Sequence, residues 1–435
     1  MMLRQTNRLS STHRHRRGTL YVGVMMSATV VAIIGLGSLS VAHLGVRSAQ
    51  NTRDAESAAQ LARTAVELGV RQINANPFWR YLVLNNLDYS PWGHSLNGGT
   101  ISYRYVDPDG DFLNNSADGI RVYGTGRCGA ATYVESVLLQ PTGDGVSCLE
   151  AALHCRSHLN LQNYCNIVTP HFLSVDGSIT ASATQCEIAG RVEATGSVNG
   201  NITGTRSAFV SARQMPGNTA FEYYRANGTA IDIGTIPLSS NVRVVSNRLF
   251  APRLNPFGAA GNAEGIYVID CQGQNLRIEH SRVLGTLVIL NPGTICCFQG
   301  SVAHAPVSPN FPAILVQGDA QFDTAWDPLS EAGRGTNFNP VDAPFENSTD
   351  VDTVDQYAAV IKGLTYVSGK LTIKANLAAE CAFDGSVVCG SIELENTGDA
   401  RFSYRPTHFD FPPPGFATGN KLQVVPGTWE RAALP

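Results

Sequence analysis

The sequence predicts a mainly β protein in which one long amino-terminal helix precedes many short strands. Two observations support this fold class: an apolar run of helical length near the start, and short apolar segments separated by turn residues over most of the remaining chain. The 42 Gly and 22 Pro also suit short strands and tight turns better than a helical bundle. With 435 residues and 43% hydrophobic content, the chain can bury a large core and form more than one folded unit.

The apolar run over residues 20–44 is the strongest single signal. No Asp, Glu, Lys or Arg occurs between Gly18 and Val46, and about 20 apolar residues are enough to cross a bilayer. We therefore expect a cytoplasmic basic segment over residues 1–19 and a transmembrane helix over residues 20–44. A cleaved secretory signal is the alternative, but its apolar region has about 7–15 residues and is shorter than this run.

Basic residues ahead of the apolar run predict the orientation of the chain. Arg14, Arg16 and Arg17 precede it, and residues 1–19 contain no acidic residue. The positive-inside rule then keeps the amino terminus in the cytoplasm. The sequence predicts a single-pass protein of the inner (cytoplasmic) membrane, with the lipid bilayer as a partner and the bulk of the chain periplasmic or extracellular.

An amphipathic helix and a small sheet are expected over residues 45–148. Apolar residues such as Ala58, Ala62 and Ile73 recur at three- and four-residue intervals, so one helix can run from about Leu20 to Asn74. Between Pro77 and Pro141 the apolar pattern changes to alternation. Three such runs predict an antiparallel sheet that packs on the helix.

The amino-terminal junction carries a family resemblance. The order Arg16-Arg17-Gly18-Thr19-Leu20, a long apolar helix and Ala-rich amphipathic turns resembles type IV pilin-like proteins, particularly the PilX-like minor pilins, over roughly Arg16 to Ile73. The resemblance implies cleavage between Gly18 and Thr19 and docking on other pilin-like subunits. In that family, the fifth residue of the mature protein is a glutamate that helps subunits dock. Cleavage after Gly18 would place Gly23 at this position of the present chain. An uncleaved signal anchor with a helical stalk is the alternative.

The segment Asp-Pro-Asp-Gly-Asp is the only weak metal candidate. Asp107, Asp109 and Asp111 resemble the opening of a calcium loop, in which alternate carboxylates bind one hard cation. The glutamate that closes an EF-hand loop is missing, and an acidic hairpin turn is the favoured interpretation. The ten cysteines contain no Cys-x-x-Cys motif of a zinc site. They are open to two interpretations, disulfides in an oxidising envelope or buried thiols. No cofactor is expected.

Residues 149–410 predict a right-handed parallel β-helix, or solenoid. Runs such as Val175-Asp-Gly-Ser-Ile179 place two apolar side chains on one face of a strand, and each run is too short to fold alone. Their composition resembles β-solenoid regions of bacterial surface proteins. An all-β sandwich is the alternative fold. We expect excursions near residues 215–255 and 321–355, and a Pro-rich tail over residues 411–435 that lies on the last coils.

These features predict a non-enzymatic, membrane-anchored surface protein. The expected role is a pilus-assembly or pilin-like component whose solenoid contacts pilin-like subunits or cell-wall and surface glycan, for interaction or adhesion. With 15% charged residues and a net charge of −4, nucleic acid is not an expected partner. The alternative is a membrane-anchored polysaccharide-degrading β-helix enzyme. Its candidate carboxylates would be Asp270, Glu279, Asp319, Asp323, Glu393 and Glu395.

Overall fold

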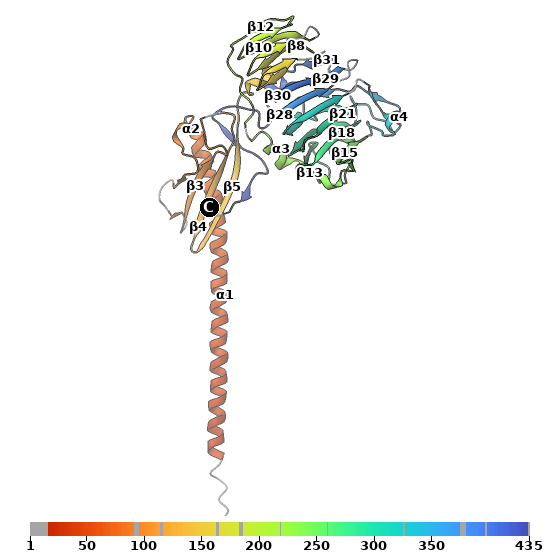
Figure 1. Cartoon of the computed structure of the whole chain (residues 1–435). Helices are drawn as coiled ribbons and strands as arrows, with labels where there is room; N and C mark the ends of the chain where they lie inside the picture. The colour runs from red at the N-terminus through yellow and green to blue at the C-terminus, as the bar shows by residue number, and fades with distance from the viewer. Residues whose placement is uncertain are drawn as a thin grey trace, which may run out of the picture.

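One long helix projects from a head that is built mainly of β strands (Figure 1). The computed structural model describes residues 16–90, 95–96, 98–113, 116–161, 165–181, 186–217, 219–258, 260–324, 327–374, 380–395 and 398–433. The head has two parts. In the helix–sheet unit, the upper half of the long helix packs on an antiparallel sheet. The second part is a stack of parallel strands, called the strand stack below.

The long helix α1 (Arg16–Ala75) has 60 residues and agrees with the predicted helix. Its upper half buries small and apolar residues on the sheet, among them Ala62, Val66 and Ile73. Packing of this face stabilises the helix far more than local propensity does. After its end, the side chain of Asn76 accepts a hydrogen bond from the Phe78 backbone, and a short helix, α2 (Trp79–Leu82), follows.

The sheet of the helix–sheet unit is an antiparallel meander that contains the three alternating runs of the sequence. It consists of β3 (Gly99–Val106), β4 (Ile120–Cys128) and β5 (Ala131–Pro141), and β3 also pairs with β1 (Asp88–Tyr89) and β2 (Ser95–Leu96). Gly126 in β4 lets α1 come close, because a Cβ there would lie 2.2 Å from the Ala58 carbonyl oxygen. A larger residue would separate helix from sheet.

The carboxy-terminal segment returns to the helix–sheet unit. Strands β32 (Leu422–Val424) and β33 (Glu430–Arg431) both pair with β5. The Asn74 side chain, at the end of α1, donates to the Leu422 carbonyl (2.8 Å) and accepts from the Leu422 amide (2.9 Å). The expectation that the tail lies on the last coils is therefore wrong for these two strands, because β5 offers them an open edge.

The strand stack consists of three ladders of parallel, in-register strands. The first ladder runs β13 (Thr229–Ile231), β17 (Ile266–Asp270), β20 (Thr286–Leu290), β23 (Pro312–Gln317), β28 (Leu364–Lys374), β30 (Val387–Glu395), β6 (Leu153–Cys155), β8 (Asn166–Val175), β10 (Glu187–Ala194) and β12 (Arg206–Ser207). The second runs β15 (Val242–Ser246), β18 (Asn275–Glu279), β21 (Cys296–Gly300) and β24 (Ala320–Thr324), then the later halves of β28 and β30. The third runs β16 (Leu249–Phe250), β19 (Arg282–Leu284), β22 (Ala303–Ala305), β27 (Ile361–Lys362), β29 (Glu380–Asp384) and β31 (Asp399–Ser403), then the earlier halves of β8 and β10. This parallel pairing differs from the antiparallel sheets that the sandwich alternative predicted.

Strand order in the stack does not follow chain order. The first strand after the helix–sheet unit, β6, pairs with β30, so that Leu153 lies opposite Val387. The neighbouring strand β8 pairs with β31 in the same way. The chain therefore enters and leaves the stack in its middle, while β12 and β13 lie towards its two ends (Figure 1). A small parallel sheet of β7 (Leu159–Leu161), β9 (Ile179–Ala181) and β11 (Val198–Gly200) continues beside the β12 end.

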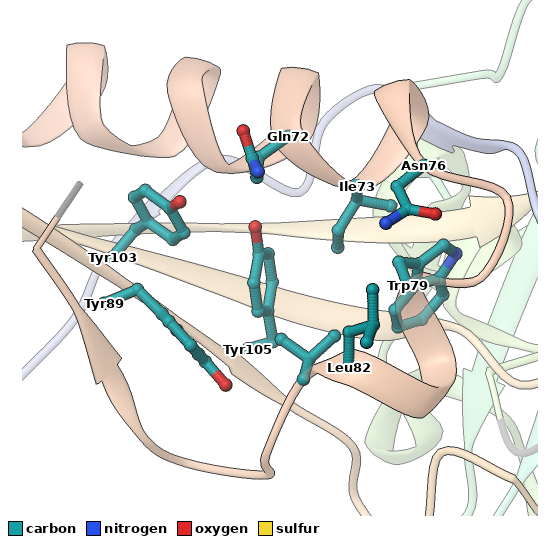
Figure 2. Close-up of a pocket in the computed structure, with 9 residues that line it drawn as sticks. Gln72, Ile73, Asn76, Trp79, Leu82, Tyr89, Tyr103 and Tyr105 are labelled. Carbon is teal, nitrogen blue, oxygen red and sulfur yellow. The ribbon is translucent and has the colours of Figure 1, made fainter.

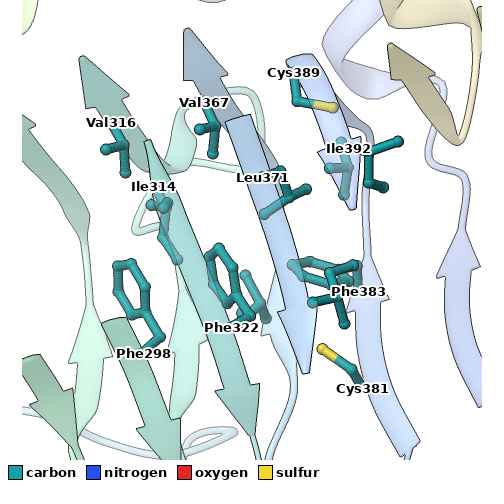
Figure 3. Packing of buried hydrophobic residues seen from close by; sticks show 14 of the residues in the cluster. Phe298, Ile314, Val316, Phe322, Val367, Leu371, Cys381, Phe383, Cys389 and Ile392 are labelled. Atoms are coloured by element: carbon teal, nitrogen blue, oxygen red, sulfur yellow. The ribbon is translucent and has the colours of Figure 1, made fainter. Parts of the chain in front are cut away.

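Like side chains stack on one another inside the strand stack (Figure 3). Phe298 and Phe322 lie opposite each other in β21 and β24, with ring centroids 4.6 Å apart, and Phe383 meets Phe322 edge-on at 5.3 Å. In-register parallel pairing brings equivalent positions together at each level, so one apolar column runs through the stack. Burial of each such side chain contributes about 1.5–3 kcal/mol.

Two segments differ from the expected excursions. Residues 229–250 carry β13, β15 and β16 and form one end of the stack, with η2 (Ile233–Thr235) and β14 (Leu238–Ser239) beside them; only the preceding part, with α3 (Glu222–Asn227), lies outside it. The second excursion starts after β24 and contains β25 (Leu329–Ser330), α4 (Glu331–Arg334) and β26 (Gln356–Tyr357).

A second apolar cluster joins the stack to the helix–sheet unit. It covers the outer side of the first ladder with Tyr224 of α3 and Phe416, and it includes Ala117 from the loop between β3 and β4. Two short helices, η1 (Ser147–Glu150) and α5 (Thr407–Asp410), lie where the chain enters and leaves the stack. The two parts of the head therefore share buried contacts.

Candidate interaction sites

The lower half of α1 exposes a long apolar surface. Every Leu, Ile, Val, Met and Tyr side chain from Leu20 to Val46 is between 54% and 73% exposed. The helix is long and apolar enough to cross a membrane, and the structure covers none of its most apolar window. Soluble monomers rarely leave so large an apolar surface uncovered, so this half requires an apolar partner.

The serine and threonine hydroxyl groups between Leu20 and Val46 are compatible with lipid. Each one bonds to a backbone carbonyl in the preceding turn of its own helix, at 2.8–2.9 Å. The donors are Ser27, Thr29, Ser38 and Ser40. Because their hydrogen bonds are internal, these side chains expose no unpaired donor to an apolar solvent.

The predicted processing and orientation residues lie at the start of α1. Arg16, Arg17, Gly18 and Thr19 belong to its first turns. Arg14 lies outside the described residues. Cleavage after Gly18 and a cytoplasmic amino terminus stay predictions.

A narrow cleft lies at the top of α1, where the helix meets α2 and the sheet (Figure 2). Its volume is about 140 Å³, and Gln72, Asn76, Tyr89, Tyr103 and Tyr105 are among its lining residues. The Tyr105 hydroxyl donates to the Gly69 carbonyl at 2.9 Å, which fixes the ring against the helix. Rings of Tyr89, Tyr103 and Tyr105 lie 5.5–6.1 Å apart.

Exposed apolar side chains follow directly after α1. Phe78, Tyr81, Leu82 and Leu84 are between 64% and 74% exposed, and Leu82 also lines the cleft. A group of this kind on a head is typical of a protein contact surface. No prediction from the sequence covers this group, although the apolar residues that follow Pro77 are a usable signal.

In the acidic loop between β3 and β4, the carboxylates that lie close together differ from the predicted set. Carboxylate oxygens of Asp107 and Asp109 come together with one from Asp118, all within 4.8 Å of one another, and Asp111 is not in this group. Burial, and then the neighbouring Asp109 and Asp118 carboxylates, raise the pKa of Asp107 to about 7. The Asp111 carboxylate is exposed and accepts from the Leu113 backbone at 2.9 Å.

The six carboxylates that the enzyme alternative would use each form an ion pair or a hydrogen bond with a nearby residue. Glu393 pairs with Lys370 at 2.8 Å and Glu395 with Lys374 at 2.6 Å. Arg277 lies 3.0 Å from Glu279, Gln299 donates to Asp323, and Asp270 and Asp319 accept backbone hydrogen bonds. None of the six belongs to the groups of three close acidic or metal-ligating residues that occur among the described residues.

The cysteines are mostly inside the head. Nine of the ten are buried, and only Cys128 is partly exposed. Cys155 lies opposite Cys389 where β6 meets β30. A hydrogen bond with the Cys389 thiol lowers the pKa of Cys155.

Comparisons with known proteins give a distant likeness among solved structures. No protein-family model matches the chain, and no curated protein matches it in sequence. Among solved structures, the competence-associated pilin ComZ from Thermus thermophilus aligns with 86% of this chain and 98% of its own, at 11% identity and a TM-score of 0.33. A similarity of this size carries no assignment of function.

Proposed function

We propose that the chain is a non-enzymatic, membrane-anchored surface component of the pilin-like kind. The observation that carries this proposal is that one continuous helix has two opposite environments. Its lower half exposes every large apolar side chain, and one face of its upper half is buried against sheet side chains that include Tyr103 and Val122. In the proposal, the lower half crosses the inner membrane with the basic segment in the cytoplasm and the head outside.

The same apolar half would dock on other pilin-like subunits. Bulky aliphatic side chains point away from α1 on all sides, so some can face lipid while others pack on neighbouring helices. Gly23 leaves this chain without the glutamate of the family at that position, so docking would rest on apolar packing alone. The exposed side chains after α1, such as Phe78 and Tyr81, would extend the contact to the head.

The strand stack, in this proposal, is a parallel β-solenoid that presents side chains outside the membrane. Three parallel ladders with a continuous apolar interior support this description. Outward side chains such as Lys370 and Glu393 repeat at the spacing of adjacent strands, about 4.8 Å. Such a regular surface suits adhesion to a repeating partner such as surface or cell-wall glycan.

Mass spectrometry of the mature amino terminus, taken from fractionated cells, tests the anchor. A membrane-bound chain that begins at Thr19 supports pilin-like processing. A membrane-bound chain that begins at Met1 supports a plain anchor and contradicts processing. A soluble chain that begins near Gln50 contradicts the membrane assignment.

Photo-crosslinking tests the proposed partners. A photoreactive residue in place of Leu36, in the exposed lower half, should capture pilin-like subunits in intact cells. The matched control replaces Gln60, which is exposed on the upper half of the same helix. Equal capture from both positions, or capture from neither, would contradict docking through the apolar half.

A further inference from the structure

The loop between β3 and β4 lies on the side of the helix–sheet unit that faces the strand stack. Asp107 follows β3 directly and Asp118 comes just before β4, so the loop brings two distant carboxylates to its base. Asp109 adds a third oxygen, and all three lie within 4.8 Å of one another. Two oxygens that share one Ca²⁺ at 2.3–2.6 Å can be at most about 5 Å apart, so this spacing suits a single ion.

Asp107 provides an independent sign of a missing ligand. Its side chain is 2% exposed, and its Oδ2 atom has no hydrogen-bond donor. The other oxygen, Oδ1, accepts a long bond of 3.4 Å from the Asp109 amide. A buried carboxylate oxygen without a donor raises the free energy of the folded state, because burial removes its hydration and no hydrogen bond replaces it. A cation at this point removes that cost.

Another cluster of three acidic residues in the described part of the chain contains a buried carboxylate that has hydrogen-bond donors. Glu331 is fully buried beside Asp350 and Asp352. Its oxygens accept from the Phe338 amide at 2.5 Å, the Asp355 amide at 3.3 Å and the Tyr357 hydroxyl at 2.8 Å. Glu331 therefore needs no ion, whereas the Oδ2 atom of Asp107 lacks every such donor.

The loop is held in shape by groups other than the three carboxylates. Asn85 accepts from the Asp107 amide at 2.8 Å, and Arg80 donates to the carbonyls of Phe112 and Asp118, both at 3.1 Å. Three carboxylates near one guanidinium leave an excess of negative charge at the base of the loop. An ion would enter an arrangement that is already fixed.

We propose that Asp107, Asp109 and Asp118 bind one Ca²⁺ ion at the junction of the helix–sheet unit and the strand stack. Oxygen-only ligands favour a hard cation over zinc or copper. Asp109 and Asp118 also line an open cavity of about 820 Å³, which admits the waters that complete six to eight ligands. This inference is independent of the proposed function.

Binding at this loop would strengthen the junction. The Gln214 side chain, from the segment after β12, donates to the Ser116 hydroxyl at 2.8 Å, and Ala117 is buried in the cluster that covers the first ladder. An ion bound by Asp107 and Asp118 would tie together the two ends of this loop and so support its contacts with the stack.

Calcium titration of the full-length chain in detergent tests the proposal, by calorimetry with CaCl₂ and with MgCl₂ for comparison. We expect one Ca²⁺ per chain and a higher unfolding temperature with calcium. Asp107→Asn and Asp118→Asn should each weaken binding by at least about tenfold, as loss of a charged ligand does. The matched control Asp111→Asn, in the same loop, should leave the affinity within about twofold, because its carboxylate bonds to its own loop.

The calcium titrations of the variants distinguish a site at this loop from binding elsewhere. Far-UV circular dichroism identifies a variant that fails to fold, and the other of the two ligand variants then decides. No calcium binding at millimolar concentration overturns the proposal. Binding that survives both ligand variants, or that Asp111→Asn weakens equally, places the ion elsewhere and also overturns it.

Discussion

The two halves of α1 are parts of one continuous helix, yet they meet opposite surroundings. Four glycines of the lower half, Gly23, Gly35, Gly37 and Gly45, have nothing within 4 Å of where a Cβ would be. In the upper half, helix and sheet are in such close contact that β4 needs Gly124 and Gly126. The difference shows that helix formation is common to both halves, whereas the partner differs: sheet for one, and an apolar environment outside the chain for the other.

The largest expected effect comes from filling the contact between helix and sheet. Gly126→Val places a Cβ 2.2 Å from the Ala58 carbonyl oxygen and 2.4 Å from the Ala62 amide, so α1 must shift. We expect a loss of about 3 kcal/mol in the free energy of unfolding, as overpacking produces. Urea unfolding of the detergent-solubilised chain measures it. Gly37→Val is the control and should change the value little; equal losses in both variants would refute the contrast between the halves.

The next effect is acid sensitivity, which should be confined to the head. Burial lowers the pKa of His304 and of His408 to about 4, and the neutral His408 ring accepts from the Leu364 amide at 3.2 Å. The unfolded chain takes up these protons near pH 6.5, so stability is complete above that pH and falls as the pH drops towards 4. From pH 7 to 5 each ring should cost about 2 kcal/mol.

Unfolding measurements at pH 7 and pH 5 test this prediction. His408→Gln keeps an acceptor for the Leu364 amide but cannot titrate, so it should remove part of the acid sensitivity. A variant as acid-sensitive as the parent chain would show that His408 is not responsible.

The smallest of the three effects concerns the end of α1. Asn74→Ala removes both hydrogen bonds to Leu422, which should cost about 1–2 kcal/mol. Hydrogen exchange of residues 422–424 should then become faster, because this strand loses its contact with the helix. Asn51→Ala, an exposed position on the same helix, is the control. Unchanged exchange in Asn74→Ala would show that pairing with β5 alone holds the strand.

Local patterns in the sequence predict the elements well. The three- and four-residue spacing of Ala58, Ala62 and Ala65 predicts the buried face of α1, and the alternation around Tyr103 predicts β3. These signals depend only on near neighbours in the chain. Each pattern reflects the favourable free energy of burying one face of a helix or strand. The spacing of apolar residues in a single sequence shows which face that is.

Long-range order could not be predicted in the same way. Apolar spacing specifies which face of a strand is buried but not which strand lies beside it, so the pairing of Leu153 with Val387 has no local signal. The acidic loop shows the same limit. Asp111 follows Gly110, whose φ is 89°, and lies outside the group of close carboxylates, whereas Asp118 joins that group only through the fold.

Carbonate extraction of cell membranes, followed by protease treatment of spheroplasts, tests the central claim that the lower half of α1 lies in lipid. The account predicts a chain that resists extraction at high pH and loses its head to external protease, while a short fragment with residues 20–46 stays in the membrane. Release of the intact chain by carbonate, or a head that protease reaches only after cell lysis, would contradict it.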